Sequence, residues 1–72
     1  MLDKKAFGKR VKHHRKAAGL GQRDVAAALG ISLTMTSMYE TGRHVPKLDR
    51  LLTLCDVLGC SPNDLLSTVI PA

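Results

Sequence analysis

Apolar side chains recur at intervals of three or four residues in five short segments, and glycine or proline separates each segment from the next. This spacing is typical of amphipathic α-helices and differs from the simple alternation of a half-buried strand. The pattern therefore predicts five helices, over about residues 3–18, 22–29, 32–41, 47–58 and 61–70.

The first predicted helix has one apolar and one basic face. Asp3 is expected to cap its N-terminus and Gly19 to follow its last turn. Arg15 falls at the border between the two faces. The apolar stripe carries Phe7, Val11, His14 and Ala18, and the basic face carries Lys4, Lys5, Lys9, Lys12 and Lys16.

The second and third predicted helices are separated by a turn of three residues, Gly30-Ile31-Ser32. Ser32 is expected to cap the third helix, and Gly42 follows that helix directly. Two short helices around such a turn have the spacing of a helix-turn-helix motif. The motif would cover about residues 22–41.

The fourth predicted helix has a long apolar face and the fifth has a strong start signal. Ser61 stands at the N-cap of the fifth helix, Pro62 at its first helical position, and Asp64 where a capping box places its acidic residue. The apolar face of the fourth helix carries Leu48, Leu51, Leu52, Cys55 and Leu58. Both helices are therefore expected to close one small core.

Composition restricts the chain to a single small domain, here taken as residues 1–72. Hydrophobic residues make up 44% and charged residues 24%, a balance typical of a folded chain. Phe7 and Tyr39 are the only Phe, Tyr or Trp residues, so the core must be aliphatic. This composition favours helices over a sandwich or barrel, and we expect an all-α fold.

The sequence also argues against several classes of protein. A chain this short has little room for a catalytic cleft, and it has no Cys-His constellation or carboxylate pair suited to catalysis. Cys55 and Cys60 are too few for a secreted disulfide framework and lack the spacing of a metal site, so we expect no metal and no cofactor. Without a membrane-length apolar run or a signal-peptide pattern, a cytoplasmic location is expected.

In their order and spacing the segments resemble the phage repressor/Cro (Xre-type) helix-turn-helix family over about residues 7–66. The resemblance is carried by residues 19–32, by Tyr39-Glu40-Thr41-Gly42, by Pro46 and by residues 54–61. It implies a compact five-helix, lambda-repressor-like domain. It also implies a repressor-like transcriptional regulator whose partner is double-stranded DNA, and which is nucleoid-associated when bound.

The resemblance further implies which residues meet DNA. In such folds the third helix lies in the major groove and the second crosses the backbone. Gln22 matches the family residue that clamps a phosphate beside a helix N-terminus. By position, the implied base-reading residues are Leu33, Thr34, Ser37 and Met38, and the implied backbone contacts are Gln22, Ser32, Arg43 and Lys47.

Two further positions carry structural expectations. Arg15 and Glu40 match a family pair that links the first helix to the end of the third, and we expect a buried salt bridge rather than a surface pair. Thr36 stands where most relatives carry an aliphatic residue. Its methyl group can still pack, and its hydroxyl can donate back to the carbonyl of Ser32.

The implied reading face is unusually apolar, because Leu33, Met35 and Met38 offer no hydrogen bond to a base edge. In one interpretation these side chains contact thymine methyl groups. In the other, the helix is rotated so that Met35 and Met38 serve the core while Thr34 and Ser37 point outward. We favour partial exposure of both methionines, because Tyr39 already occupies the core position.

Net charge supports a nucleic-acid partner but does not locate the contact. The chain carries 11 Lys+Arg against 6 Asp+Glu, a formal charge of +5. Residues 1–24 contain eight Lys or Arg and two Asp, whereas the remaining chain is slightly acidic. In the implied fold most of the first helix lies away from the groove, so we interpret its basic face as mainly solvated, with no membrane role and with long-range attraction of DNA.

The sequence also bears on assembly and on the class of partner. Apolar residues near the C-terminus, Leu66, Val69 and Ile70, exceed the needs of a small core and suggest a homodimer that binds paired half-sites. The alternative function is a protein-interaction module of the same fold, such as an antitoxin or adaptor. The apolar reading face keeps that alternative open.

Overall fold

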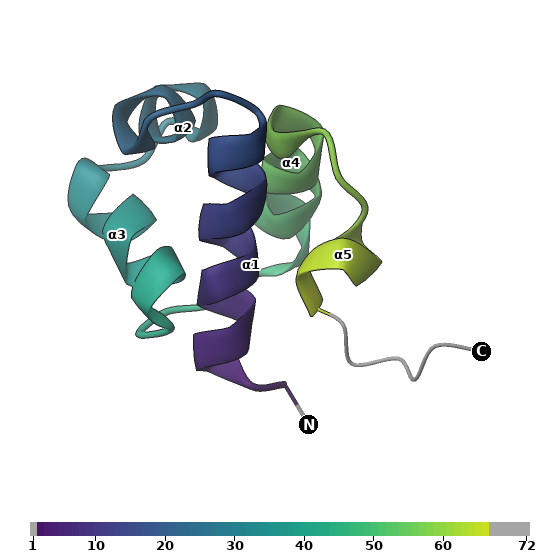
Figure 1. Cartoon of the computed structure of the whole chain (residues 1–72). Helices are drawn as coiled ribbons and strands as arrows, with labels where there is room; N and C mark the ends of the chain where they lie inside the picture. Colours follow the sequence, from purple (N-terminus) through teal and green to yellow (C-terminus); the bar gives the residue numbers. More distant parts are fainter. Residues whose placement is uncertain (1, 67–72) are drawn as a thin grey trace.

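Five α-helices account for the regular structure of residues 2–66, the part of the chain that the computed structural model describes. They are α1 (Lys4–Ala17), α2 (Gln22–Leu29), α3 (Leu33–Thr41), α4 (Leu48–Leu58) and α5 (Pro62–Leu66). In Figure 1, α1 runs in front, with α2 and α3 on one side of it and α4 and α5 on the other. The predicted all-α fold is confirmed, with the starts of α1 to α5 each within one residue of expectation.

Capping residues explain why the helices begin where they do. The Asp3 carboxylate accepts hydrogen bonds from two N–H groups in the first turn of α1, each at 3.1 Å. The Ser32 hydroxyl accepts from the Met35 N–H at 3.0 Å. At α5, the Ser61 N–H donates to Asp64 and the Asp64 N–H donates to the Ser61 hydroxyl, as a capping box requires. The bond from the Ser61 N–H, followed by hydrogen bonding from the Ser61 side chain, holds the pKa of the Asp64 carboxyl below its ordinary value.

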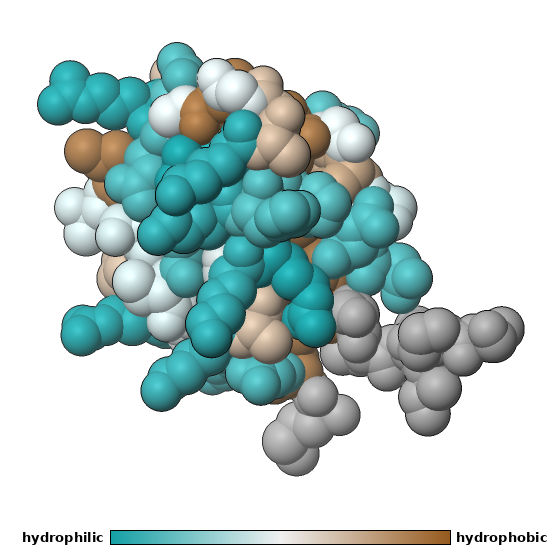
Figure 2. All heavy atoms as spheres, in the orientation of Figure 1, coloured by the Kyte–Doolittle hydropathy of each residue, from teal (hydrophilic) through white to brown (hydrophobic). Residues whose placement is uncertain are grey.

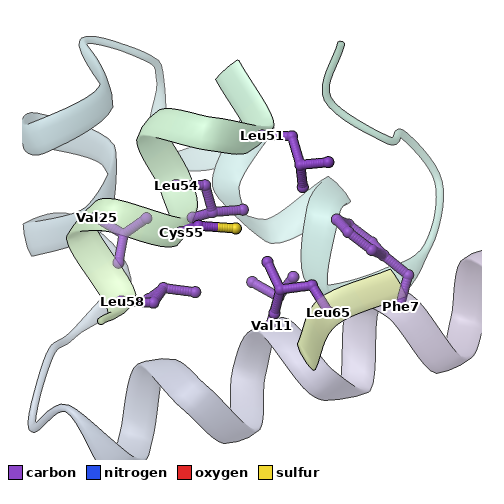
Figure 3. Packing of buried hydrophobic residues seen from close by; sticks show 8 residues of the cluster. All are labelled: Phe7, Val11, Val25, Leu51, Leu54, Cys55, Leu58 and Leu65. Atoms are coloured by element: carbon purple, nitrogen blue, oxygen red, sulfur yellow. The ribbon is translucent and has the colours of Figure 1, made fainter. Parts of the chain in front are cut away.

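The hydrophobic core joins four of the five helices (Figure 3). Its members are Phe7 and Val11 of α1, Val25 of α2, Leu51, Leu54, Cys55 and Leu58 of α4, and Leu65 of α5. None of these residues belongs to α3. The core therefore fastens α1, α2, α4 and α5 to one another, and α3 needs other contacts.

Three residues predicted on apolar faces are exposed instead. Ala18 is exposed at the C-cap position that follows the last residue of α1. Leu48 is 68% exposed and Leu52 is 44% exposed, whereas Leu54 is fully buried. The prediction for α4 is confirmed for Leu51, Cys55 and Leu58 and wrong for Leu48 and Leu52, because many leucines occupy that helix and spacing alone does not say which of them point inward.

The described C-terminal residues are partly used by the core. Leu66 is half-buried and packs against the hydrophobic cluster. Val69 and Ile70, the other two residues of the predicted dimer contact, lie outside the described residues. Within residues 2–66 no helix is long and apolar enough to cross a membrane.

Candidate nucleic-acid interface

One shallow hollow, of about 490 Å³, gathers most of the residues predicted to meet DNA. It lies between the start of α2, the outward face of α3 and the loop after α3. Its lining consists of Gln22, Leu33, Thr34, Ser37, Met38, Thr41 and Arg43. All four predicted base-reading residues and two of the four predicted backbone residues therefore share one surface.

The hollow also separates the two methionines of α3. Both are half-buried, but Met38 lines the hollow and Met35 does not. Leu33 is the most exposed apolar residue of the lining, at 42%. Thr36 and Tyr39 occupy the buried side of α3, whereas Leu33 is exposed and Met35 and Met38 are half-buried, as partial exposure of the methionines predicts.

Thr41 is a lining residue that sequence reasoning missed. Its hydroxyl donates to the Met38 carbonyl at 3.2 Å and stays on the exposed side of α3. The signal was available, because Ser37 follows Thr34 by three residues and Thr41 follows Ser37 by four, which places all three on one helix face. Ser32, by contrast, is absent from the lining, and its hydroxyl oxygen is engaged as the N-cap of α3.

A buried polar network holds α3 to the rest of the domain. The guanidinium of Arg15 contacts both carboxylate oxygens of Glu40, with Nη2 to Oε1 at 3.2 Å. Their side chains are only 10% and 4% exposed. Arg15 Nη1 also donates to the carbonyl of Leu20 at 2.9 Å, so one side chain joins α1, the following loop and α3.

Gln22 belongs to the same network as well as to the hollow. Its amide Nε2 donates to Glu40 Oε1 at 3.1 Å. An amide nitrogen carries two N–H donors, and the bond to Glu40 uses one of them. The contact fixes the direction of the Gln22 side chain, and it ties the predicted phosphate clamp to the helix that would read bases.

Two glycines allow the close approach of α1 and α3. A Cβ on Gly8 would overlap the Glu40 carbonyl and lie 2.8 Å from the Tyr39 carbonyl oxygen. At the end of α3, Gly42 has a left-handed φ of 80°, and a Cβ there would lie 2.7 Å from the Lys4 carbonyl oxygen. Neither position tolerates a side chain without moving the backbone of the partner helix.

Lys47 lies apart from the reading hollow, in a second hollow of about 550 Å³ beside α4. His44 and Arg50 line the same surface, and the His44 ring stacks on Tyr39 with a centroid separation of 5.9 Å. Arg50 is a further basic residue that sequence reasoning missed, although it follows Lys47 at helical spacing. The hollow also contains Asp49, so its charge is mixed.

The basic face of α1 is solvated. Figure 2 shows hydrophilic side chains covering the α1 face of the molecule. All five predicted lysines, Lys4, Lys5, Lys9, Lys12 and Lys16, are exposed, and none lines the reading hollow. Most positive charge is thus placed to act at a distance, and Arg43 is the one ionised side chain in the lining of the hollow.

Metal chemistry has no support in this part of the chain. Among residues 2–66, no three His, Cys, Asp or Glu side chains gather in a group that could hold a metal ion. The arrangement on α2 and α3 instead offers apolar groups, hydroxyls, one amide and one guanidinium on an open surface.

Comparison with known proteins matches this arrangement to regulators. The sequence profile of a family described as a helix-turn-helix domain matches residues 6–67. The ImmF control region 10 kDa protein of Bacillus phage phi105 is 37% identical over 70 residues, which are 97% of this chain and 78% of that protein. The transcriptional repressor RstR of cryptic phage CTXphi in Vibrio cholerae is 36% identical over 56 residues, or 78% of this chain.

A solved structure extends the match to three dimensions. The P22 c2 repressor protein, crystallised in complex with a synthetic operator, superposes with a TM-score of 0.80 at 30% identity. The match covers 88% of this chain and 96% of that one. The chain spans only half the length of RstR, so the match to that repressor concerns one part of it.

Proposed function

This chain belongs to the phage repressor/Cro (Xre-type) helix-turn-helix family, and we propose that it is a sequence-specific DNA-binding transcriptional regulator of the repressor type. The observation that carries the proposal is the single hollow on α2 and α3, which brings six of the eight predicted DNA-contacting residues together. A surface of this size and composition fits the edge of a DNA major groove better than a small ligand.

The residues of the hollow divide by chemistry. Leu33, Thr34, Ser37 and Met38 face the base edges, with Thr41 beside them. Leu33 and Met38 suit thymine methyl groups, whereas the hydroxyls of Thr34 and Ser37 suit base-edge donors and acceptors. The proposed reader thus prefers T-containing positions and makes few direct hydrogen bonds to bases.

The backbone contacts come from the borders of the surface. Gln22 and Arg43 are proposed to contact phosphates at the rim of the hollow, and Ser32 to do so through its N-terminal position on α3. Lys47 is proposed to act from the second hollow, and Arg50 is added there as a further candidate. Contacts of this kind position the helix and make affinity depend on salt.

Selection from random duplexes, followed by binding titrations at several salt concentrations, tests the proposal. An enriched sequence and an affinity that falls steeply with salt are expected. Arg43→Ala should weaken all sequences alike and lower the salt slope by about one, while Lys12→Ala on the solvated α1 face should leave that slope nearly unchanged. Absence of any preferred sequence at low salt would refute sequence-specific DNA binding.

Two leucines of matched exposure test base reading separately. Leu33 in the hollow is 42% exposed, and Leu52 on α4 is 44% exposed. Leu33→Ala is expected to change which base is preferred at one position of the selected site, and Leu52→Ala is expected to leave the site unchanged. Equal effects of the two variants would mean that α3 is not the reading helix.

We further propose that two copies bind one operator, through the apolar residues Leu66, Val69 and Ile70. The support is chemical: one small domain offers few base contacts, and two-fold assembly doubles them at half-sites about 34 Å apart. Because Leu66 already packs against its own core, the contact would fall mainly on the other two residues. A selected site without two-fold symmetry, together with a monomer on DNA in sedimentation, would exclude this assembly.

A protein-interaction module is the second candidate, favoured by the 42% exposure of Leu33 beside Met38. An apolar surface of this kind also suits a protein partner, as in an antitoxin or adaptor. The two functions separate in the selection experiment, since a module of this kind enriches no DNA sequence at any salt concentration.

A further inference from the structure

The turn between α4 and α5 brings the two cysteines of the chain together. Gly59 adopts a left-handed φ of 71°, and the Cys60 N–H donates to the Cys55 carbonyl at 3.0 Å, which is the pattern of a Schellman turn. In such a turn the residue after the glycine regularly contacts the residue three positions before the last helical one. Both positions are cysteines here, and both side chains pack on the same hydrophobic cluster.

The two thiols differ in access. Cys55 is 3% exposed and sits among the core side chains (Figure 3), whereas Cys60 is half-buried at the edge of the same cluster. Burial raises the pKa of both thiols, that of Cys60 to about 11. Near neutral pH both are therefore protonated and react slowly, and Cys60 is the one that a small reagent reaches first.

We propose that Cys55 and Cys60 form an oxidisable dithiol that closes to an intramolecular disulfide when the chain meets a low-molecular-weight disulfide. Two observations place the pair: the Schellman turn, with its left-handed glycine and its backbone hydrogen bond from Cys60 to Cys55, and the packing of both side chains on one cluster. Simple apolar packing would need no second sulfur at this contact. The proposal does not rest on DNA binding.

The chemistry is two steps of thiol–disulfide exchange. The Cys60 thiolate attacks one sulfur of the small disulfide, forms a mixed disulfide and releases one small thiolate. The Cys55 thiolate then attacks Sγ of Cys60, forms the Cys55–Cys60 bond and displaces the second small thiolate. The two released thiolates take up the protons that the cysteines lose, and two electrons pass from the cysteine pair to the small disulfide.

Closure should stabilise the domain. The bond would span a turn whose backbone is already fixed in the folded chain, so its main effect is to restrict the unfolded chain. Leu65 of α5 is fully buried one turn further on, which ties this connection to the core. In Figure 1 the turn lies on the other side of α1 from α3, so the reading surface should keep its geometry.

The test incubates the whole chain in glutathione buffers of rising oxidised fraction, followed by alkylation of free thiols under denaturing conditions and mass spectrometry. A monomer that has lost two hydrogens, carries no glutathione and takes up no alkylating reagent is expected. Its rate of formation should rise about tenfold per pH unit between about pH 7 and 9, because the thiolate fraction does so. The oxidised chain should melt about 5 °C or more above the reduced chain.

Single-cysteine variants are the controls. Cys55→Ala leaves the accessible thiol and should stop at the glutathione mixed disulfide, while Cys60→Val leaves the buried thiol and should react little. A wild-type chain that also stops at the mixed disulfide would overturn the proposal. So would disulfides between chains, closure only after denaturation, or a lower melting temperature after oxidation.

Discussion

Helices α3 and α4 are both short and both partly buried, yet different interactions hold them in place. Helix α4 contributes Leu51, Leu54, Cys55 and Leu58 to the hydrophobic core. Helix α3 contributes nothing to that cluster. It is held by the Arg15–Glu40–Gln22 network, by backbone contact at Gly8 and Gly42, and by burial of Thr36 and Tyr39.

The difference follows from what each helix has to expose. A helix that presents one face to a DNA groove has only a narrow side left to bury against its own domain. Because that side offers little apolar area, directional polar contacts set the angle of the helix. Salt bridges and close backbone contacts fix position more sharply than hydrophobic burial, which is non-directional. The structure therefore places its directional contacts on the proposed reading helix, beside the buried aromatic ring of Tyr39, and most of its aliphatic contacts on the supporting helix.

The largest expected effect comes from breaking the polar attachment of α3. Glu40→Ala leaves the buried Arg15 guanidinium without its partner and should cost about 3–5 kcal/mol in the free energy of unfolding. Urea unfolding followed by circular dichroism measures this loss. Asp56→Ala removes an exposed acid from α4 and should change the value by less than about 0.5 kcal/mol. Similar values for both variants would mean that the network does not hold α3.

The next effect tests the apolar attachment of α4. Leu54 is fully buried, and Leu54→Ala should cost about 3 kcal/mol through lost burial and a new cavity. Leu48, on the same helix, is 68% exposed, and Leu48→Ala should cost under about 0.5 kcal/mol. Thermal and urea unfolding should rank the pair in this order. The reverse order would show that α4 packs through its other face.

A smaller effect is expected at the close contact of α1 and α3. Alanine is the better helix former by about 1 kcal/mol, yet Gly8→Ala should destabilise by about 1–3 kcal/mol because its methyl group meets the α3 backbone. Amide hydrogen exchange should show lower protection in α3 than in α4. If Gly8→Ala raised the free energy of unfolding, α1 and α3 would be able to move apart without loss of stability.

The smallest effect concerns the buried hydroxyl of α3. Thr36 Oγ1 donates to the Ser32 carbonyl at 3.3 Å, and that carbonyl also accepts from the Thr36 N–H. Thr36→Val should therefore change stability by less than about 1 kcal/mol. Thr53→Val on the exposed side of α4 is the matched control, because the Thr53 hydroxyl donates to the backbone carbonyl of Asp49, four residues earlier, at 3.2 Å. A large loss of unfolding free energy for Thr36→Val alone would mean that the Thr36 hydroxyl is also one of the directional contacts that hold α3.

Local signals in the sequence were sufficient for the five helices and for where they begin. Asp3, Ser32 and Ser61 cap α1, α3 and α5 as expected, because a capping side chain bonds to backbone only two or three residues away. The five-helix order followed from apolar spacing and from the residues that interrupt it. The same signals did not decide which leucines of α4 point inward, since Leu48 and Leu54 are the same residue type on different sides of the helix and only packing against the other helices buries Leu54.

The sequence by itself thus determined the helices, the helix-turn-helix spacing and most positions of the proposed reading face. Only the tertiary structure decided the role of Gly8, the attachment of Gln22 to Glu40, and the meeting of the base-reading residues with Arg43 in one hollow. The physical reason is range: caps and turns act within a few residues, whereas each of these contacts joins helices whose angle depends on the whole packed core.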